Sequence, residues 1–266
     1  MNITSQFLET VQDIVLQAGK KIAKEREIFE SKKIQHKSSF DLVSYVDIET
    51  EKFLINELTK LNSSIGFIAE ESHQYHPKEW NWIIDPLDGT TNFTRQLPAY
   101  AISVALAHHK DIKYGWVYNI PANELFFAEN NNGAYLNANK ISVAQNSKLA
   151  DCLIATGFSV SKFDKVDIHL NVVKEIIQNS LGIRRMGAAA VDLCYVACGR
   201  FDAFFEWYLN PWDVAAGSLI AQEAGAIVSD FSCGKNFLYG KEILTAQPLI
   251  YQDILHIIQK YIQHDI

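Results

Sequence analysis

The residues with the clearest chemical potential are acids that follow apolar runs, where predicted strands end. Glu70 and Glu71 follow the apolar residues 66–69, and Asp85 follows the apolar residues 82–84. Asp88 comes three positions later, and Asp213 opens another apolar segment. A carboxylate at a buried strand end is costly unless it is paired or bound to a cation. Because converging acids would repel one another, the pattern predicts a Mg²⁺ site built from hard oxygen ligands.

The residues between the first acids favour a tight turn followed by a helix start. Pro86 favours an extended backbone at Asp85, and the turn can direct Asp85, the Leu87 carbonyl and Asp88 toward one or two ions. The Gly-Thr-Thr sequence at residues 89–91 is typical of a helix start, whose free backbone N–H groups attract phosphate. Such a turn alone fits a simple helix cap equally well. The metal site is favoured because Glu70, Glu71 and Asp213 occur elsewhere in the chain in a similar setting.

The chemistry that suits clustered acids and a phosphate-binding turn is the hydrolysis of a phosphate monoester. Enzymes accelerate this reaction by up to ~10²¹, whereas one positioned general base contributes about 10²–10⁴. Metal ions supply much of the difference, because they lower the pKa of bound water and stabilise the attacking and leaving oxygens. The acids of this sequence are sufficient for a paired metal site.

A second phosphatase mechanism also has a match in the sequence. Cys194 and Arg200 stand at the C-x5-R spacing of cysteine phosphatases. That chemistry needs a flexible loop of small residues and a thiol with a lowered pKa. Residues 188–193 instead continue an apolar helix pattern, and Tyr195 favours burial. We therefore expect Cys194 and Cys198 to be small core residues.

The bulk composition suits a globular protein. The chain has 266 residues, 48% apolar and 21% charged, with a formal net charge of −7. An acidic chain repels nucleic acid and anionic membranes at long range, although bound metal ions can reverse the sign of one pocket. The cysteines lack zinc-type pairing, the N-terminus lacks a secretory pattern, and the longest apolar run, residues 99–107, is too short for a membrane span. We expect a cytoplasmic protein with reduced thiols.

Apolar periodicity predicts helices and strands that alternate along the chain. Helices are predicted at residues 7–22, 47–61, 167–177, 188–197, 214–224 and 251–262. Strands are predicted at residues 66–69, 82–84, 101–107, 114–118, 125–128, 134–136, 152–156, 203–205 and 226–229. Asp47 is expected to cap the second helix, Asn-Asn-Gly at residues 131–133 to form a hairpin turn, and His108 and His109 to face solvent. This mixture predicts an α+β architecture.

Two segments resemble the signature motifs of the inositol monophosphatase family. The first is DPLDGTTNF at residues 85–93, and the second is PWDVAAG at residues 211–217, which leads into EAGA at residues 223–226. The Glu-Glu pair at residues 70–71 stands upstream of the first motif at the usual spacing of the family. Residues 37–43 and Asp47 resemble its N-terminal block, so the resemblance covers nearly the whole chain.

The resemblance implies a layered α-β-α-β-α sandwich of the inositol monophosphatase / sugar bisphosphatase type. It implies one domain over residues 1–266, with an N-terminal half of about residues 1–145 and a C-terminal half of about residues 146–266. Members of the family are usually homodimers, depend on magnesium and are inhibited by lithium.

The resemblance also implies a role for each matching residue. Two or three Mg²⁺ ions would be bound by Glu70, Asp85, the Leu87 carbonyl, Asp88 and Asp213. Thr90 and Glu70 would orient the attacking water, Asp47 would support them, and Lys37 would lie nearby in a supporting role. Substrate would be bound by Asp88, Gly89, Thr90, Thr91, Gly187, Ala188, Ala189 and Glu206.

Two features bear on the substrate. Thr91-Asn92-Phe93 resembles the branch of the family that acts on inositol phosphates, and Glu206 stands seven residues before Asp213, where those enzymes carry a polyol-binding acid. The bulky pair at residues 207–208, Trp-Tyr, departs from the pattern and is expected to narrow the pocket. The predicted substrate is therefore inositol 1-phosphate or a related small polyol phosphate.

Other substrates and another role stay open at this point. NADP, 3′-phosphonucleotides and sugar bisphosphates suit the same mechanism. A bacterial homologue in this family acts within transcription antitermination complexes, so an added binding role is an alternative. Its only visible support is the pair Arg184 and Arg185 with the neighbouring helix, and the two arginines equally suit a surface pair, a dimer contact or a small basic patch. The acidic net charge argues against direct nucleic-acid binding.

Overall fold

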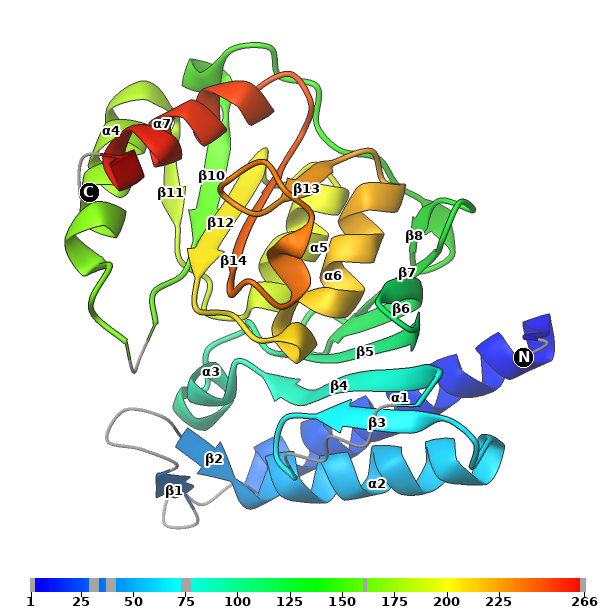
Figure 1. Ribbon diagram of the computed structural model, residues 1–266. Coiled ribbons are helices and arrows are strands. Elements are labelled where there is room, and N and C mark those ends of the chain that lie inside the picture. Colours follow the sequence, from blue (N-terminus) through cyan, green and yellow to red (C-terminus); the bar gives the residue numbers. More distant parts are fainter. Residues whose placement is uncertain (1–2, 29–33, 37–41, 73–77, 160–161, 264–266) are drawn as a thin grey trace.

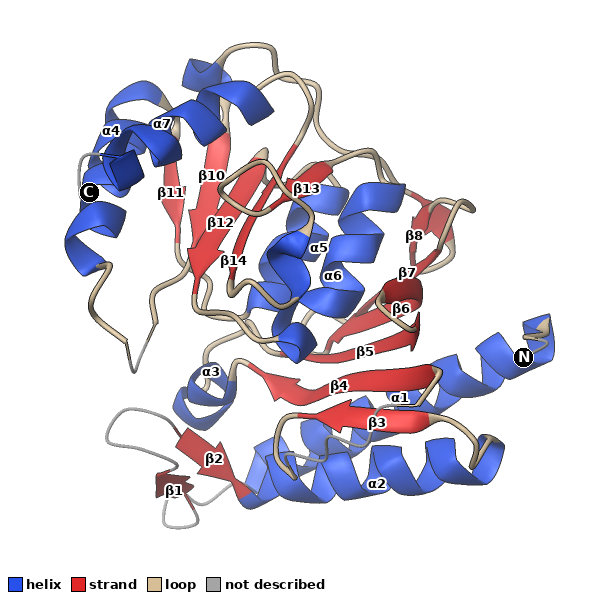
Figure 2. Cartoon of the chain, in the orientation of Figure 1, coloured by secondary structure: helices blue, strands red, loops and turns tan. Residues whose placement is uncertain are grey.

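A computed structural model describes residues 3–28, 34–36, 42–72, 78–159 and 162–263. Figure 1 shows the two larger sheets with helices on both outer sides and a helix pair between these sheets. The same view coloured by secondary structure, Figure 2, makes the alternation of helix and strand layers plain. The order of the layers is α-β-α-β-α, which confirms the predicted α+β sandwich. Within the described ranges, no helix is both long and apolar enough to span a membrane.

The first layer is a pair of helices, α1 (Ser5–Ile28) and α2 (Tyr45–Leu61). α1 buries an apolar stripe at helical spacing that includes Val11, Val15 and Ile22. The prediction that Asp47 caps α2 is wrong, because Ser44 is the N-cap residue and accepts a hydrogen bond from the Val46 N–H at 3.1 Å. Asp47 lies at the third helical position and completes a capping box by accepting from the Ser44 N–H at 2.9 Å.

The second layer is a seven-stranded sheet in sequence order. Its strands are β3 (Gly66–Ala69), β4 (Trp80–Asp88), β5 (Ala101–His108), β6 (Asp111–Asn119), β7 (Glu124–Glu129), β8 (Ala134–Leu136) and β9 (Asn139–Lys140). β3 runs parallel to β4, and the other neighbours are antiparallel. The predicted hairpin turn at residues 131–133 joins β7 to β8. The short helix α3 (Thr90–Arg95) follows β4 directly.

The third and fourth layers are the helices α5 (Ala189–Ala197) and α6 (Pro211–Glu223) and a five-stranded sheet in the order β11-β10-β12-β14-β13. The strands are β10 (Leu153–Thr156), β11 (Gly182–Arg184), β12 (Ala203–Trp207), β13 (Ile227–Ser229) and β14 (Glu242–Ala246). β10 pairs in parallel with β11 and β12, whereas β14 is antiparallel to its neighbours. Neither β11 nor β14 was predicted, because each offers only a short apolar pattern.

The last layer is formed by α4 (Val166–Asn179) and α7 (Tyr251–Gln263), which cover the outer face of the five-stranded sheet (Figure 1). Small elements complete the chain: β1 (Ile34–His36), β2 (Leu42–Ser44), and 3₁₀ turns at Leu149–Asp151 and Asn236–Leu238. The large sheet falls within residues 66–140 and the small sheet within residues 153–246. The proposed boundary between two halves near residue 145 stays a prediction.

Two glycines allow the central helices to approach each other and the large sheet. Gly217 of α6 lies against Leu193 of α5, and Gly115 of β6 lies against the backbone of Ala216. A Cβ added at Gly115 would come within 2.9 Å of the Ala216 carbonyl oxygen. This close packing fixes α6 on the large sheet, and so fixes the position of Asp213 in the first turn of α6.

Candidate active site

The predicted acids come together in one pocket of about 250 Å³ at the C-terminal ends of β3 and β4. The first turns of α3, α5 and α6 and the end of β12 complete its walls. The predicted residues that line it are Glu70, Asp85, Leu87, Asp88, Gly89, Thr90, Thr91, Gly187, Ala188, Ala189, Glu206 and Asp213. Asp47 reaches the pocket through a hydrogen bond, and Lys37 lies outside the described residues.

The parallel pairing of β3 and β4 places Glu70 beside Asp85. Ala69 is in register with Ile84, and the Glu70 N–H donates to the Ile84 carbonyl at 3.3 Å. Asp85 is 2% exposed, and its Oδ1 accepts from the Leu87 N–H at 3.0 Å. The pairing of β4 with β5 shifts after Asp85, so a bulge turns the strand end.

The other two acids are held by helix starts. The Ala190 N–H, in the first turn of α5, donates to Oδ2 of Asp88 at 2.7 Å. Asp213 is the third residue of α6, and its Oδ2 accepts from the Asn210 N–H at 2.6 Å. α6 begins with Pro211, whose fixed φ suits the first helical position. Acids near helix N-termini are stabilised by the helix dipole, yet both still face the pocket.

The electrostatics of the pocket are those of crowded carboxyl groups. Burial, followed by the charge of Glu70, raises the pKa of Asp85 and of Asp213 well above the usual range. Burial raises the pKa of Asp88 to about 7, although the Ala190 N–H opposes this shift. The acids and the Leu87 carbonyl bring oxygen donors to this pocket, and oxygen is the donor type that Mg²⁺ prefers. The residues therefore fit a hard divalent cation.

Thr90 connects the pocket to α2. Its hydroxyl donates to Oδ1 of Asp47 at 2.7 Å, and Asp47 is fully buried. Burial also raises the pKa of Asp47. The preceding Gly89 has φ +89°, and a Cβ there would lie 2.8 Å from the Ala99 carbonyl oxygen, so this position requires glycine.

Glu206 is a further acid that lines the pocket. It lies in β12 at 9% exposure, and burial raises its pKa to about 8. Gly157 packs directly on it, because a Cβ at that position would overlap the Glu206 carboxylate. The same pocket is also lined by residues 187–189.

Arg185 is a pocket residue that the sequence did not single out as one. It lines the pocket, and its charge opposes the rise in the pKa of Glu206 and of Asp88. Asp192 of α5 is also buried nearby; burial and the charge of Glu206 raise its pKa well above the usual range. The position of Arg185 follows from β11, the strand that was not predicted, so no sequence signal could have placed it.

The bulky pair after Glu206 divides between core and rim. Trp207 is 4% exposed and packs edge-on against Phe231, with ring centroids 4.4 Å apart. Tyr208 has φ +68°, a left-handed backbone that is uncommon for a non-glycine residue. Its hydroxyl donates to Oδ2 of Asp164 at 2.5 Å, which ties β12 to the segment before α4. Both residues of the pair line the pocket together with Phe158. The narrowing of the pocket by this pair stays a prediction.

The cysteine alternative is not supported. Cys194 is fully buried inside α5, and burial raises the pKa of its thiol well above the usual range. Arg200 forms a bidentate pair with Glu124, with one bond of 2.7 Å. Cys198 is half-buried against the central core. A thiol that is held protonated is a poor nucleophile. The burial of Cys194 confirms the prediction that it is a core residue.

Comparison with known proteins agrees with this geometry. The family model described as "Inositol monophosphatase family" matches residues 4–263. A relative from Neisseria meningitidis serogroup B, "Putative Nus factor SuhB", is 40% identical over 96% of this chain and 99% of its own length. The "Inositol monophosphatase" of Dictyostelium discoideum is 36% identical over 94% of each chain.

A solved structure shows the same fold. The extragenic suppressor protein suhB of Bartonella henselae superposes with a TM-score of 0.91 at 35% identity, covering 96% of this chain and 99% of that protein. The family model spans almost the whole sequence and includes every acid of the pocket. This chain therefore belongs to the inositol monophosphatase family of phosphatases.

Proposed function

We propose that this phosphatase hydrolyses inositol 1-phosphate or a related small polyol phosphate, using a water molecule activated by Mg²⁺. The observation that carries the proposal is the convergence of Glu70, Asp85, Asp88 and Asp213 with the Thr90 hydroxyl in one pocket. Oxygen ligands crowded in this way need a cation, and a cation suits an anionic phosphate.

The size of the pocket supports a small substrate. Its volume of about 250 Å³ is below the roughly 300–1,000 Å³ that is usual for pockets of drug-sized ligands. A single-ring polyol phosphate suits this space better than the dinucleotide NADP. Glu206 faces the same space and can accept hydrogen bonds from the hydroxyl groups of a polyol when ionised.

Each residue has a defined task in the proposed reaction. The four acids and the Leu87 carbonyl would hold two or three Mg²⁺ ions, which supply Lewis acidity and a bound water of lowered pKa. Glu70 and Thr90 would orient that water, and Asp47 would fix the Thr90 hydroxyl by accepting its proton in a hydrogen bond. The backbone amides of Gly89, Thr90 and Thr91 would bind the phosphate oxygens.

A panel of phosphate esters tests this proposal. We expect phosphate release from inositol 1-phosphate in Mg²⁺, none in EDTA, and slower release from fructose 1,6-bisphosphate, adenosine 3′,5′-bisphosphate and NADP. Preference for one of the other three would keep the mechanism and overturn the polyol assignment. The absence of release from all four would overturn the proposal. In the same assay, millimolar lithium should inhibit the enzyme.

We also propose that the protein is a cytoplasmic homodimer that pairs through the outer face of α4. Apolar side chains stay exposed along this face, including Leu170 at 51% and Ile177 at 54%. Leu181, which precedes the edge strand β11, is 69% exposed. Exposed apolar groups that cluster in this way favour a protein interface. Sedimentation should give a dimer, and Leu170→Glu combined with Ile177→Glu should give a monomer.

A second candidate function is binding to a transcription complex. It is favoured by the name of the Neisseria meningitidis relative, a putative Nus factor, and by the exposed Arg184 of β11. The net charge of −7 argues against direct contact with RNA. Pull-down with an Asp88→Asn variant separates the two roles, since binding that survives the loss of activity would support a distinct binding function.

A further inference from the structure

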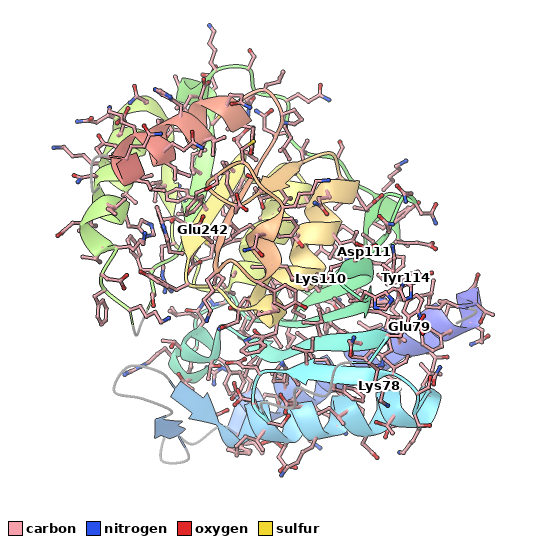
Figure 3. All side chains as sticks on the ribbon, in the orientation of Figure 1. Lys78, Glu79, Lys110, Asp111, Tyr114 and Glu242 are labelled. Atoms are coloured by element: carbon pink, nitrogen blue, oxygen red, sulfur yellow. The ribbon has the colours of Figure 1, made fainter. Side chains whose placement is uncertain are left out.

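One carboxylate and two imidazoles lie together at the end of the large sheet that is remote from the pocket. Glu79 immediately precedes β4, His108 ends β5, and His109 begins the two-residue turn to β6. One ligand atom from each of the three side chains lies within 4.8 Å of the other two. Figure 3 shows Glu79 at this end of the sheet, with Lys110 of the turn and Asp111, the first residue of β6, labelled nearby.

The backbone holds these three residues in place. Trp80 is in register with His108, and the His109 N–H donates to the Glu79 carbonyl at 2.8 Å. His109 has φ +55°, a left-handed turn conformation that histidine adopts more readily than most residues. Its ring centroid lies 4.5 Å from that of His108. The donors therefore come from neighbouring strand ends and a tight turn rather than from a long loop.

Two of the three candidate ligand side chains already lie close together. Nε2 of His108 lies 2.9 Å from Oε1 of Glu79. The ring of Trp80 packs against the His108 ring at 4.6 Å between centroids and restrains it. One cationic neighbour is directed elsewhere, because Nζ of Lys78 donates to the Ser63 carbonyl at 3.1 Å. Asp111 adds a negative charge, and its Oδ2 forms an ion pair with Nζ of Lys113 at 3.3 Å.

We propose that Glu79, His108 and His109 form a binding site for a borderline divalent transition metal of the zinc class. Two imidazole nitrogens and a carboxylate oxygen are a ligand set that Zn²⁺ accepts, with solvent in the fourth position. The mixed nitrogen and oxygen donors distinguish this site from the all-oxygen pocket, which suits Mg²⁺.

The site is separate from the catalytic pocket. Asp85 comes six positions after Glu79 along extended chain, which is a span of roughly 20 Å at about 3.3 Å per residue. Glu79 directly precedes β4 in the sequence, and the other end of β4 leads to α3, as Figure 1 shows for these two elements. A metal bound here would link the start of β4 to the β5–β6 turn. Because the unfolded chain lacks this arrangement, binding should stabilise the fold.

Zinc titration of the full chain in excess Mg²⁺ tests the site. We expect one Zn²⁺ bound at micromolar affinity, a higher melting midpoint with zinc, and selective shifts of the His108 and His109 ring signals in NMR. The test variants are His109→Asn, whose asparagine tolerates the left-handed turn, and Glu79→Gln. Each single variant should weaken zinc binding at least tenfold. The control His256→Asn, on the exposed side of α7, should bind as the wild type does.

Two results would overturn the site. One is equal zinc affinity in wild type, His109→Asn and Glu79→Gln. The other is a zinc-induced shift of the His256 ring signal with none at His108 and His109. Phosphatase activity in Mg²⁺ should be the same in His109→Asn and wild type, so the outcome is independent of the proposed catalytic function.

Discussion

The Thr90 hydroxyl donates a 2.7 Å hydrogen bond to Oδ1 of Asp47, a residue 43 positions earlier in the chain. The other carboxylate oxygen of Asp47 accepts from the hydroxyl of Ser44 and its backbone N–H. The N-terminus of α2 therefore sets the direction of the Thr90 hydroxyl at the edge of the acidic pocket. The capping box of α2 and the proposed water-orienting group share one carboxylate.

Removal of the Thr90 hydroxyl should slow catalysis without unfolding the protein. Thr90→Ala should lower kcat by about 10²–10⁴, the usual contribution of one positioned group in proton transfer. Thr90→Ser keeps the hydroxyl and should retain most of the activity. The measurement is steady-state turnover of inositol 1-phosphate, with melting midpoints to show that both variants fold. Equal activity in Thr90→Ala and wild type would remove Thr90 from the mechanism.

The stability of the metal-free protein should fall as pH rises above neutrality. Burial raises the pKa of Asp88 to about 7 and of Glu206 to about 8, so the folded chain retains protons that the unfolded chain has lost. Stability decreases with pH wherever the folded state binds more protons. Mg²⁺ should counter this fall by stabilising the ionised acids of the pocket.

The test is the melting midpoint in EDTA and in Mg²⁺ between pH 7 and 8.5. Below this window His169 acts in the opposite sense, because burial lowers its pKa to about 4 and folding excludes a proton that the unfolded histidine binds. We expect the midpoint in EDTA to decline across the window and the gain from Mg²⁺ to grow. A midpoint in EDTA that rises with pH in this window would contradict the reading of the pocket acids.

Tyr208 should control the size of the accepted leaving group. Tyr208→Gly removes the contact with Asp164 and suits the backbone φ of +68°. We expect kcat/KM for adenosine 2′-phosphate to rise relative to kcat/KM for inositol 1-phosphate. A change in the shape of a pocket usually alters such a ratio by roughly 10–200-fold. Tyr208→Phe, which loses only the hydroxyl, should shift the ratio less. An unchanged ratio in both variants would show that the rim does not select substrates.

Cys194→Ser should leave turnover nearly intact. The thiol is fully buried in α5, and its raised pKa excludes a thiolate at neutral pH. The assay is phosphate release, with Cys194→Ala as a second variant in case a buried hydroxyl weakens the fold. A folded but inactive variant would restore the cysteine mechanism.

The sequence predicted the parts of the site that depend on local order along the chain. Asp85, Asp88 and Thr90 belong to one strand-turn-helix unit, so apolar runs and turn residues were enough to place them together. Asp213 could be joined to them through the family motif, and the structure brings it to the same pocket.

What the sequence could not show depends on strand order and register. Arg185 lines the pocket because β11 pairs with β10, and β11 has only three residues. Glu79 meets His108 because Trp80 pairs with that histidine across two strands. Aspartate and serine both suit helix starts, and only the backbone shows that Ser44, not Asp47, precedes the first turn of α2.

The most direct test of the central claim is Mg²⁺-dependent phosphate release by Asp88→Asn. Asparagine can keep the hydrogen bond from the Ala190 N–H but loses the charge that would bind the metal. The matched control is Asp253→Asn on the exposed side of α7. We predict that Asp88→Asn loses orders of magnitude in turnover of inositol 1-phosphate and that Asp253→Asn keeps wild-type turnover. Wild-type, EDTA-sensitive activity in Asp88→Asn would contradict the assignment of the pocket as the catalytic metal site.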